Sequence, residues 1–280
     1  MLISEFTEEA FITSFCIVLS HYPHGKNLII DRISQRDEAK KGYDGTLHLK
    51  NIVYLQFKTS DFFSQNCIGS IRTAREKIVS SRGEEFYSFK LYKKNNYNQH
   101  NTLQRLALNN DAFYCAPLFH TKEDLKRFNI LEDNNINIDE ELNYNKDSLI
   151  NNTICIKPEP KITDSESHRY SYNKLYDVVF HSEPVKQTEN SYLFSNYFNE
   201  FINTKRNISF KSILEFMDES YKEDGTNIYS KLVDFYNRTQ KKDSNEYLFK
   251  KEMSDLTIGI IFENYLKSNF NIIQFCVFSK

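Results

Sequence analysis

The stretch Ile52-Val53-Tyr54-Leu55-Gln56-Phe57-Lys58 is an apolar run that ends in a glutamine and a lysine two positions apart. Its β-branched and aromatic residues favour a strand. Because they occupy both alternating faces, the strand is expected to be covered on both sides. Side chains along a strand alternate with period two, so Gln56 and Lys58 should project from the same face. The sequence therefore predicts a central strand with polar groups at one end.

The residues before this strand predict a helix and a β-hairpin. The segment Phe6 to Leu19 has apolar residues at helical spacing, a candidate N-cap at Thr7 and acidic residues in its first turn. Asn27 to Ile33 follows as a short strand. Thr46 to Leu49 and Ile52 to Thr59 are expected to form the hairpin.

The residues that follow alternate between helical and strand patterns. The expected elements, in chain order, are a helix at Ile68 to Val79, a strand at Phe86 to Tyr92, a helix at Gln99 to Leu108 and a strand at Ala112 to Phe119. This order predicts an α/β (α+β) protein in which a mixed central sheet is flanked by helices.

The second half of the chain has a looser pattern that becomes mainly helical. The expected strands are Thr153 to Ile156, Tyr170 to Tyr172, Val178 to Phe180 and Ile272 to Phe278, and the expected helices are Lys122 to Phe128, Tyr192 to Ile202, Phe210 to Tyr221, Ile228 to Tyr236 and Tyr247 to Tyr265. We expect residues 1–120 to form a core domain and residues 121–280 an accessory β/helical region that binds substrate or a partner.

Composition limits the class of protein. A formal net charge of −2 gives no overall basic field, so any nucleic-acid-binding surface has to be local. The five cysteines stand singly, which argues against a disulfide framework or a zinc knuckle. The sequence has no signal-peptide pattern and no window near the ~18 apolar residues of a membrane span. We expect a cytoplasmic protein that does not associate with membranes.

Asp44 stands twelve positions ahead of Gln56 and completes a candidate active site. Phosphodiester hydrolysis needs a cation, a polarised water and a group that positions that water. Hard oxygen ligands suit Mg²⁺ or Mn²⁺. Asp44 is expected to be the principal metal ligand, the Gln56 amide oxygen a second and the Phe57 backbone carbonyl a third. Lys58 is expected to orient the attacking water.

A carboxylate from the first helix is expected to complete the metal site. The candidates are Glu8 and Glu9. Glu8 is three residues before Phe11 and seven before Phe15, on the stripe that faces the core, so it is preferred. The choice between the two glutamates stays open.

This arrangement resembles the PD-(D/E)XK, or restriction-endonuclease-like, nuclease superfamily, in its Mrr-like variant with glutamine in place of the second acid. The likeness covers roughly residues 5–120 and includes the first helix and the helix after the lysine strand. It implies a restriction-endonuclease-like fold with Asp44, Gln56 and Lys58 in catalytic positions. In this chain Gln56 brings no charge, so the metal would be held by fewer anions.

The resemblance also implies a function and partners. It implies a metal-dependent endonuclease, acting on DNA rather than RNA, that serves as the effector of a restriction or antiphage defence system. The chain has no phosphate-binding NTPase motif, so an NTPase or sensor would be a separate subunit. A homo-oligomer is left open. The alternative is a catalytically silent protein of the same fold that binds protein or nucleic acid as a scaffold.

The turn of the predicted hairpin decides whether the site can form. A strict two-residue turn at Lys50-Asn51 would pair Asp44 with Phe57 and point it away from Gln56. A three-residue loop, or a bulge at one of the glycines flanking Asp44, restores the shared face. We therefore expect one of these irregularities.

A locally basic segment follows the lysine strand. Between Ile68 and Arg105 eight basic residues stand against three acidic ones. Basic side chains of this kind contact phosphates, and the candidates for nucleic-acid binding are Arg72, Arg75, Lys93, Lys94 and Gln99. A charge run can equally be a solvated face, and Gln99 can equally belong to a polar helix start.

Overall fold

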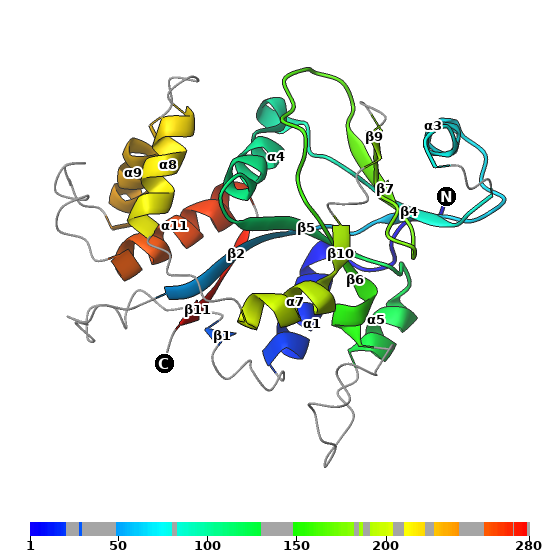
Figure 1. The fold of residues 1–280 in the computed structure, drawn as a ribbon, viewed down its shortest axis with the longest axis horizontal. Coiled ribbons are helices and arrows are strands. Elements are labelled where there is room, and N and C mark those ends of the chain that lie inside the picture. Colours follow the sequence, from blue (N-terminus) through cyan, green and yellow to red (C-terminus); the bar gives the residue numbers. More distant parts are fainter. Residues whose placement is uncertain are drawn as a thin grey trace, which may run out of the picture.

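The computed structural model describes residues 1–20, 28–29, 49–79, 83–129, 148–181, 185–186, 191–203, 210–221, 227–240, 255–270 and 272–278. Within these ranges the chain forms two sheets with helices packed around them (Figure 1). Helices α8 (Phe210–Tyr221), α9 (Ile228–Gln240) and α11 (Asp255–Phe270) gather at one end of the molecule. Helix α3 (Ser70–Glu76) lies at the opposite end.

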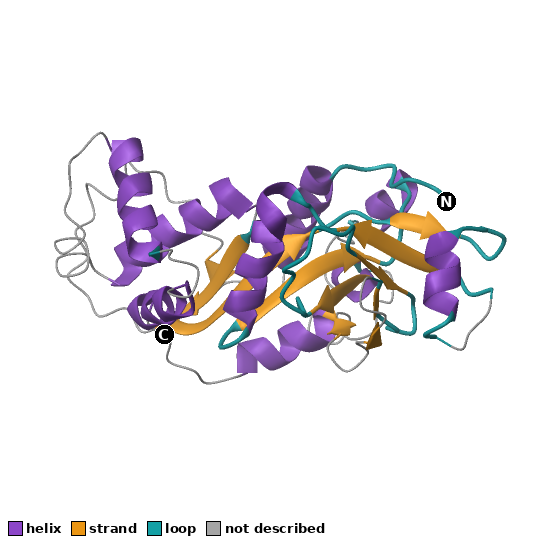
Figure 2. Ribbon diagram, turned by 90° about the horizontal axis from the view of Figure 1, so that it is seen from above, coloured by secondary structure: helices purple, strands orange, loops and turns teal. Residues whose placement is uncertain are grey.

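The larger sheet has six strands and contains the predicted central strand. Its order is β1 (Leu28–Ile29), β11 (Ile273–Phe278), β2 (Leu49–Phe57), β5 (Asp111–Pro117), β6 (Thr153–Ile156) and β10 (Ser191–Leu193). Strand β2 is antiparallel to β11 and parallel to β5. Figure 2 shows helices on both sides of the strands. The predicted mixed sheet with flanking helices is confirmed, and so is the central position of β2.

The two faces of β2 pack against different helices. Val53, Leu55 and Phe57 are buried with residues of α1 (Glu8–Ser20) and α7 (Phe194–Asn203). Ile52 and Tyr54 are buried with residues of α4 (Lys94–Ala107), α8, α9 and α11. This double coverage explains why apolar residues occupy both alternating faces of the strand.

Helix α1 begins where the sequence predicts. The Thr7 hydroxyl oxygen accepts a hydrogen bond from the Ala10 backbone N–H at 3.2 Å, which satisfies one of the first-turn donors. Phe11 and Phe15 meet the ring of Phe57 edge-on, with centroids 5.6 and 4.9 Å away. These contacts place the start of α1 beside the end of β2.

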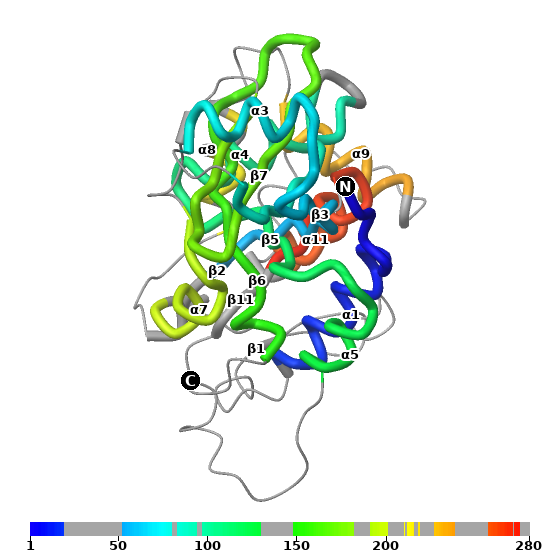
Figure 3. The backbone as a smooth tube through the Cα atoms, turned by 90° about the vertical axis from the view of Figure 1, so that its right-hand side faces the viewer, coloured from blue at the N-terminus to red at the C-terminus, as the bar shows by residue number. Residues whose placement is uncertain are grey.

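The smaller sheet has five antiparallel strands. Its order is β3 (Asp61–Phe63), β4 (Phe86–Lys90), β7 (Arg169–Tyr172), β8 (Val179–Phe180) and β9 (Val185–Lys186). Tyr172 connects the two sheets, since its hydroxyl donates to the Pro117 carbonyl at 2.8 Å. Phe86 to Tyr92, expected in the central sheet, therefore contributes its strand β4 to a second sheet. Figure 3 shows β7 and α3 on one side of the larger sheet and α1 with α5 (Lys122–Phe128) on the other.

The predicted hairpin is wrong at its turn. Strand β2 runs unbroken through Lys50 and Asn51, the two residues expected to turn. The antiparallel neighbour of β2 is β11, at the other end of the sequence, and their register shifts between Val277 and Phe278. Residues 46–48 lie outside the described ranges. The C-terminal strand thus supplies the hydrogen bonds that the hairpin partner was expected to supply.

The sheet does not break near residue 120. Strands β6, β10 and β11 come from beyond that position and lie in the same sheet as β2 and β5. The buried cluster that contains Tyr54 also contains Phe262 of α11. A division into residues 1–120 and 121–280 therefore does not coincide with a gap in the packing, and the separate roles assigned to the two parts stay predictions.

Several predicted bounds in the second half of the chain agree with the structure. Helices α5 and α8 and strand β6 begin and end at the predicted residues. In the ranges that the structure describes, every helix is too short or too polar to cross a lipid bilayer.

Candidate active site

Lys58 and Glu8 lie together at the end of the central strand. The Lys58 Nζ atom is 3.9 Å from Glu8 Oε2, and the two side chains are 12% and 30% exposed. Burial lowers the pKa of Lys58, and the Glu8 carboxylate partly opposes that change. The structure therefore brings together two residues that the sequence placed in one site. Of the two candidate glutamates, Glu8 makes this contact, while Glu9 is exposed.

Gln56 is completely buried and contacts a helix end. Its Nε2 group donates to the backbone carbonyl of Phe270, the last residue of α11, at 3.0 Å. Its Oε1 atom is buried and has no hydrogen-bond partner among the described residues. An unsatisfied buried amide oxygen is costly. This oxygen is chemically suited to be a ligand for a hard divalent cation.

The expectation that Gln56 and Lys58 project from the same face is wrong, because their polar ends contact helices on opposite faces of β2. The Gln56 amide contacts α11, whereas the Lys58 ammonium lies beside Glu8 of α1. Lys58 is the first residue beyond β2, and its backbone N–H still continues the ladder by donating to Cys115 O at 2.9 Å. The predicted convergence of the two side chains on one ion stays a prediction.

The other predicted metal ligands are placed only in part. Asp44 lies outside the described ranges, as do the glycines beside it. The ring of Phe57 is buried against α1, and the ligand role of its carbonyl stays a prediction. Within the residues that the structure describes, His, Cys, Asp and Glu side chains form no group of three or more able to hold a metal ion.

Two of the predicted nucleic-acid contacts are buried. Arg72 donates to the carbonyls of Ser64 and Glu84 and pairs with Glu76 at 3.2 Å. Arg75 donates to Ser171 O and Ser171 Oγ at 3.1 and 3.0 Å and to Asp177 O at 2.9 Å. Only 7% and 2% of the two residues are exposed. A phosphate-binding role does not fit these residues, because protein oxygens occupy their guanidinium groups.

The remaining candidates lie on or next to α4. Lys93 is exposed immediately before the helix, and Lys94 is its first residue. Gln99 lies inside the helix, not at a polar start, and its Nε2 group donates to the same Phe270 carbonyl that Gln56 contacts. The sequence suggested Gln99 as a nucleic-acid contact, and the structure instead places its amide beside the buried end of α11.

Residues that the sequence analysis did not single out contact Gln56 and Arg75. The Phe270 carbonyl is separated from Gln56 by 214 positions, and a backbone acceptor leaves no mark in the sequence. A second polar cluster joins Ser171 Oγ to His181 Nε2 at 2.7 Å beside Arg75. Burial, together with the charges of Arg169 and Arg75, lowers the pKa of His181 to about 4. The isolated histidine in the sequence gave no sign of these neighbours.

Comparison of the chain with protein-family models, curated proteins and solved structures gives no match. A functional interpretation therefore depends on the side chains themselves.

Proposed function

We propose that the protein is a metal-dependent endonuclease that hydrolyses phosphodiester bonds in DNA, with Asp44, Gln56, Lys58 and Glu8 in its active site. The Lys58–Glu8 pair at the end of β2 is the observation that carries this proposal. A lysine held in a largely buried position costs stability. A charged group whose pKa is displaced by burial is typical of functional sites.

The roles of the side chains follow from their chemistry. The Lys58 ammonium would bind a phosphate oxygen and hold the attacking water, and Glu8 would keep that ammonium charged. Asp44 and the Gln56 Oε1 atom would hold Mg²⁺ or Mn²⁺, which supplies positive charge to the phosphate and polarises water when bound. The water oxygen forms a bond to phosphorus, the ester P–O bond breaks, and the leaving oxygen takes up a proton.

The biological setting is part of the same proposal. A nuclease of this kind would act in the cytoplasm as the effector of a restriction or antiphage defence system. It would take its activating signal from a separate NTPase or sensor subunit, because its sequence has no nucleotide-binding motif of its own. Cleavage of RNA by the same residues is the less favoured substrate choice.

A catalytically silent scaffold is the second candidate. Complete burial of Gln56, and its hydrogen bond to Phe270 O, favour this alternative, because a sealed amide cannot reach a substrate. In that case Gln56 stabilises the end of α11 and Lys58 is a paired lysine of the fold.

A plasmid-cleavage assay separates the two candidates. The full chain is incubated with supercoiled DNA and Mg²⁺ or Mn²⁺, beside Lys58→Ala, Asp44→Ala and the control Lys90→Ala, which removes an exposed lysine. We expect nicking by the unmodified protein and the control and its loss in both site variants. Equal residual nicking in all four proteins rules out the endonuclease. A parallel RNA substrate shows which nucleic acid is cleaved.

A further inference from the structure

Strands β5 and β6 place two cysteines directly opposite each other. Cys115 and Cys155 are Cα partners in the antiparallel register, although they stand 40 positions apart in the chain. Both are buried, both carry free thiols, and their Sγ atoms lie 3.8 Å apart. The sequence spacing does not mark this pair, because the register of two distant strands brings the thiols together.

The cysteine pair occupies a non-hydrogen-bonded position of the ladder. The Cys115 carbonyl accepts a hydrogen bond from the Lys58 backbone N–H at 2.9 Å, so the peptide groups of Cys115 point toward β2 and away from β6. Leu118 N–H donates to the Asn152 carbonyl at 2.8 Å just past the strand ends, and counting back along alternating pairs gives the same answer. Opposite residues at such positions have Cα atoms about 4.5 Å apart and closely spaced side chains.

This arrangement meets the geometric requirements of a disulfide bond. A disulfide needs Cα atoms roughly 4.4–6.8 Å apart and sulfur atoms about 2.05 Å apart. The two Sγ atoms are 3.8 Å apart, so they need to approach by less than about 2 Å. Rotation of the two side chains can supply this approach while the strands keep their register.

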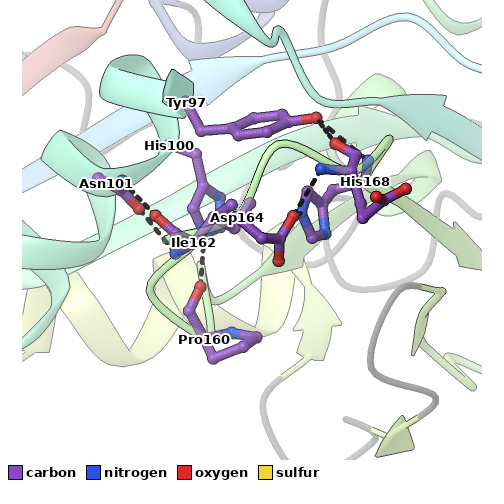
Figure 4. A network of polar contacts seen from close by, with 8 residues as sticks. Tyr97, His100, Asn101, Pro160, Ile162, Asp164 and His168 are labelled. Carbon is purple, nitrogen blue, oxygen red and sulfur yellow. Dashed lines mark hydrogen bonds and ion pairs between the residues drawn. The ribbon is translucent and has the colours of Figure 1, made fainter. Parts of the chain in front are cut away.

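His100 of α4 holds both strands in place around the thiols. Its Nδ1 atom contacts the hydroxyl of Tyr114 in β5 at 2.9 Å. Its Nε2 atom contacts the carbonyl of Pro160, just beyond β6, at 2.7 Å (Figure 4). Asn101, the next residue of the helix, exchanges two hydrogen bonds with the backbone of Ile162 at 2.8 and 2.9 Å. Because both strands are linked to the same helix, the two cysteines are kept opposite each other.

We infer that Cys115 and Cys155 are a modification site at which hydrogen peroxide forms a reversible cross-strand disulfide. One thiol attacks the peroxide, the O–O bond breaks, and a sulfenic acid and one water are produced. The second sulfur then bonds to the first, and the hydroxyl group leaves with a proton as water. In total the two thiols lose two electrons and two protons, and the peroxide becomes two waters. This inference is independent of the proposed function.

Peptide mapping of the oxidised protein tests the site. Burial raises the pKa of Cys155, so the reduced full-length chain is treated with hydrogen peroxide at about pH 8.5, where more of the reactive thiolate is present. The remaining thiols are alkylated with iodoacetamide, and a non-reducing digest is analysed by mass spectrometry. We expect a linked pair of peptides that contain Cys115 and Cys155, and its disappearance after treatment with dithiothreitol.

Cysteine variants supply the controls for this experiment. Cys115→Ala and Cys155→Ala should each abolish the linked peptides, and Cys16→Ala, at a half-buried position, should leave them. Oxidation of Cys67, which is more accessible, shows in the same sample that the peroxide was active. Recovery of Cys115 and Cys155 as separate alkylated or sulfinic peptides, while Cys67 is oxidised, overturns the inference.

Urea denaturation shows whether the bond forms within the native sheet. A disulfide that fits the folded structure restrains the unfolded chain, so the midpoint of unfolding should rise by about 1 M urea and return after reduction. Peroxide should leave the midpoint of Cys155→Ala unchanged, which separates the disulfide from oxidation elsewhere. A lower or unchanged midpoint in the linked protein means that the bond forms only after the strands separate, and this result also overturns the inference.

Discussion

The ammonium of Lys58 lies 3.9 Å from the carboxylate of Glu8, across the gap between the end of the central strand and the first turn of α1. Burial lowers the pKa of Lys58 in the folded protein, so below that pKa the charged lysine is unfavourable for folding. Stability from this group rises with pH between the lowered pKa and 10.5, where the unfolded chain binds more protons.

Substitution of Glu8 by Gln should lower the pKa of Lys58 further, because the carboxylate is the group that raises it. NMR titration of the Lys58 Nζ signal measures this change directly. In the cleavage assay, the fall in activity at alkaline pH should begin at a lower pH than in the unmodified protein. Glu9→Gln, which removes an exposed carboxylate one residue further on, is the control. A similar displacement in both variants means that the contact with Glu8 is not the cause.

Substitutions of Arg75 and Lys93 should affect different properties: the first should lower stability, and the second should weaken nucleic-acid binding. Arg75→Met removes three hydrogen bonds from a charged donor, two of them buried, and should lower the free energy of unfolding by about 3 kcal/mol or more. Lys93→Met, on an exposed side chain, should leave stability within about 0.5 kcal/mol.

Urea denaturation measures the changes in unfolding free energy. The DNA affinity of the two folded variants is measured separately, at a series of salt concentrations. DNA affinity should fall in Lys93→Met and remain in Arg75→Met. Weaker DNA binding in Arg75→Met, at full folding, would restore that arginine as a phosphate contact.

The central strand could be predicted because its signal is local. Apolar residues on both faces of Ile52 to Phe57 require two covering layers, and the structure supplies them. The partner strand could not be predicted in the same way. Strand β11 pairs with β2 from more than 200 positions away. Its apolar residues would suit pairing with any of several buried strands, so its own sequence does not identify β2 as the partner. Long-range pairing is decided by the packing of the whole domain and not by either segment alone.

The candidate site shows the same division between local and distant information. Helical spacing in the sequence predicts Thr7 as the N-cap and places Glu8 on the stripe that faces the core. In the structure Thr7 caps the helix and Glu8 contacts Lys58. Arg72 and Arg75 look like a solvated basic face in the sequence. In the structure their guanidinium groups lie 5.1 and 5.3 Å from the centre of the Phe86 ring. Charge counts along a helix cannot show that a distant aromatic strand covers it.

Cys67 should be the most reactive of the described thiols. The N-terminal ammonium of Met1 contacts its Sγ atom at 2.5 Å, and this hydrogen bond lowers the pKa of Cys67. Burial instead raises the pKa of Cys155, whose Sγ lies 3.8 Å from that of Cys115 inside the sheet. Iodoacetamide at neutral pH should therefore label Cys67 at least about tenfold faster than Cys155.

Peptide mass spectrometry after short labelling times gives the two rates. Acetylation of the N-terminus is the matched control, since it removes the ammonium and should slow labelling of Cys67 only. Equal labelling with and without acetylation would show that the ammonium does not activate this thiol.

His100 and His181 should make the fold sensitive to mild acid. Burial lowers the pKa of each to about 4, against an ordinary value of 6.5. Between these values the unfolded chain binds more protons than the folded chain, so stability is complete above pH 6.5 and is lost as the pH falls toward 4. At 1.36 kcal/mol per pKa unit, His100 alone accounts for about 3 kcal/mol.

Substitution of His100 should reveal its share of this acid sensitivity. His100→Gln removes the titrating group, keeps an amide donor for Pro160 O and should make the decline in unfolding free energy between pH 6.5 and 4 less steep. The measurement is urea denaturation at a series of pH values. The same slope in the unmodified protein and His100→Gln would mean that His100 can be protonated without loss of the contacts to Tyr114 and Pro160, and that carboxylates elsewhere govern acid unfolding.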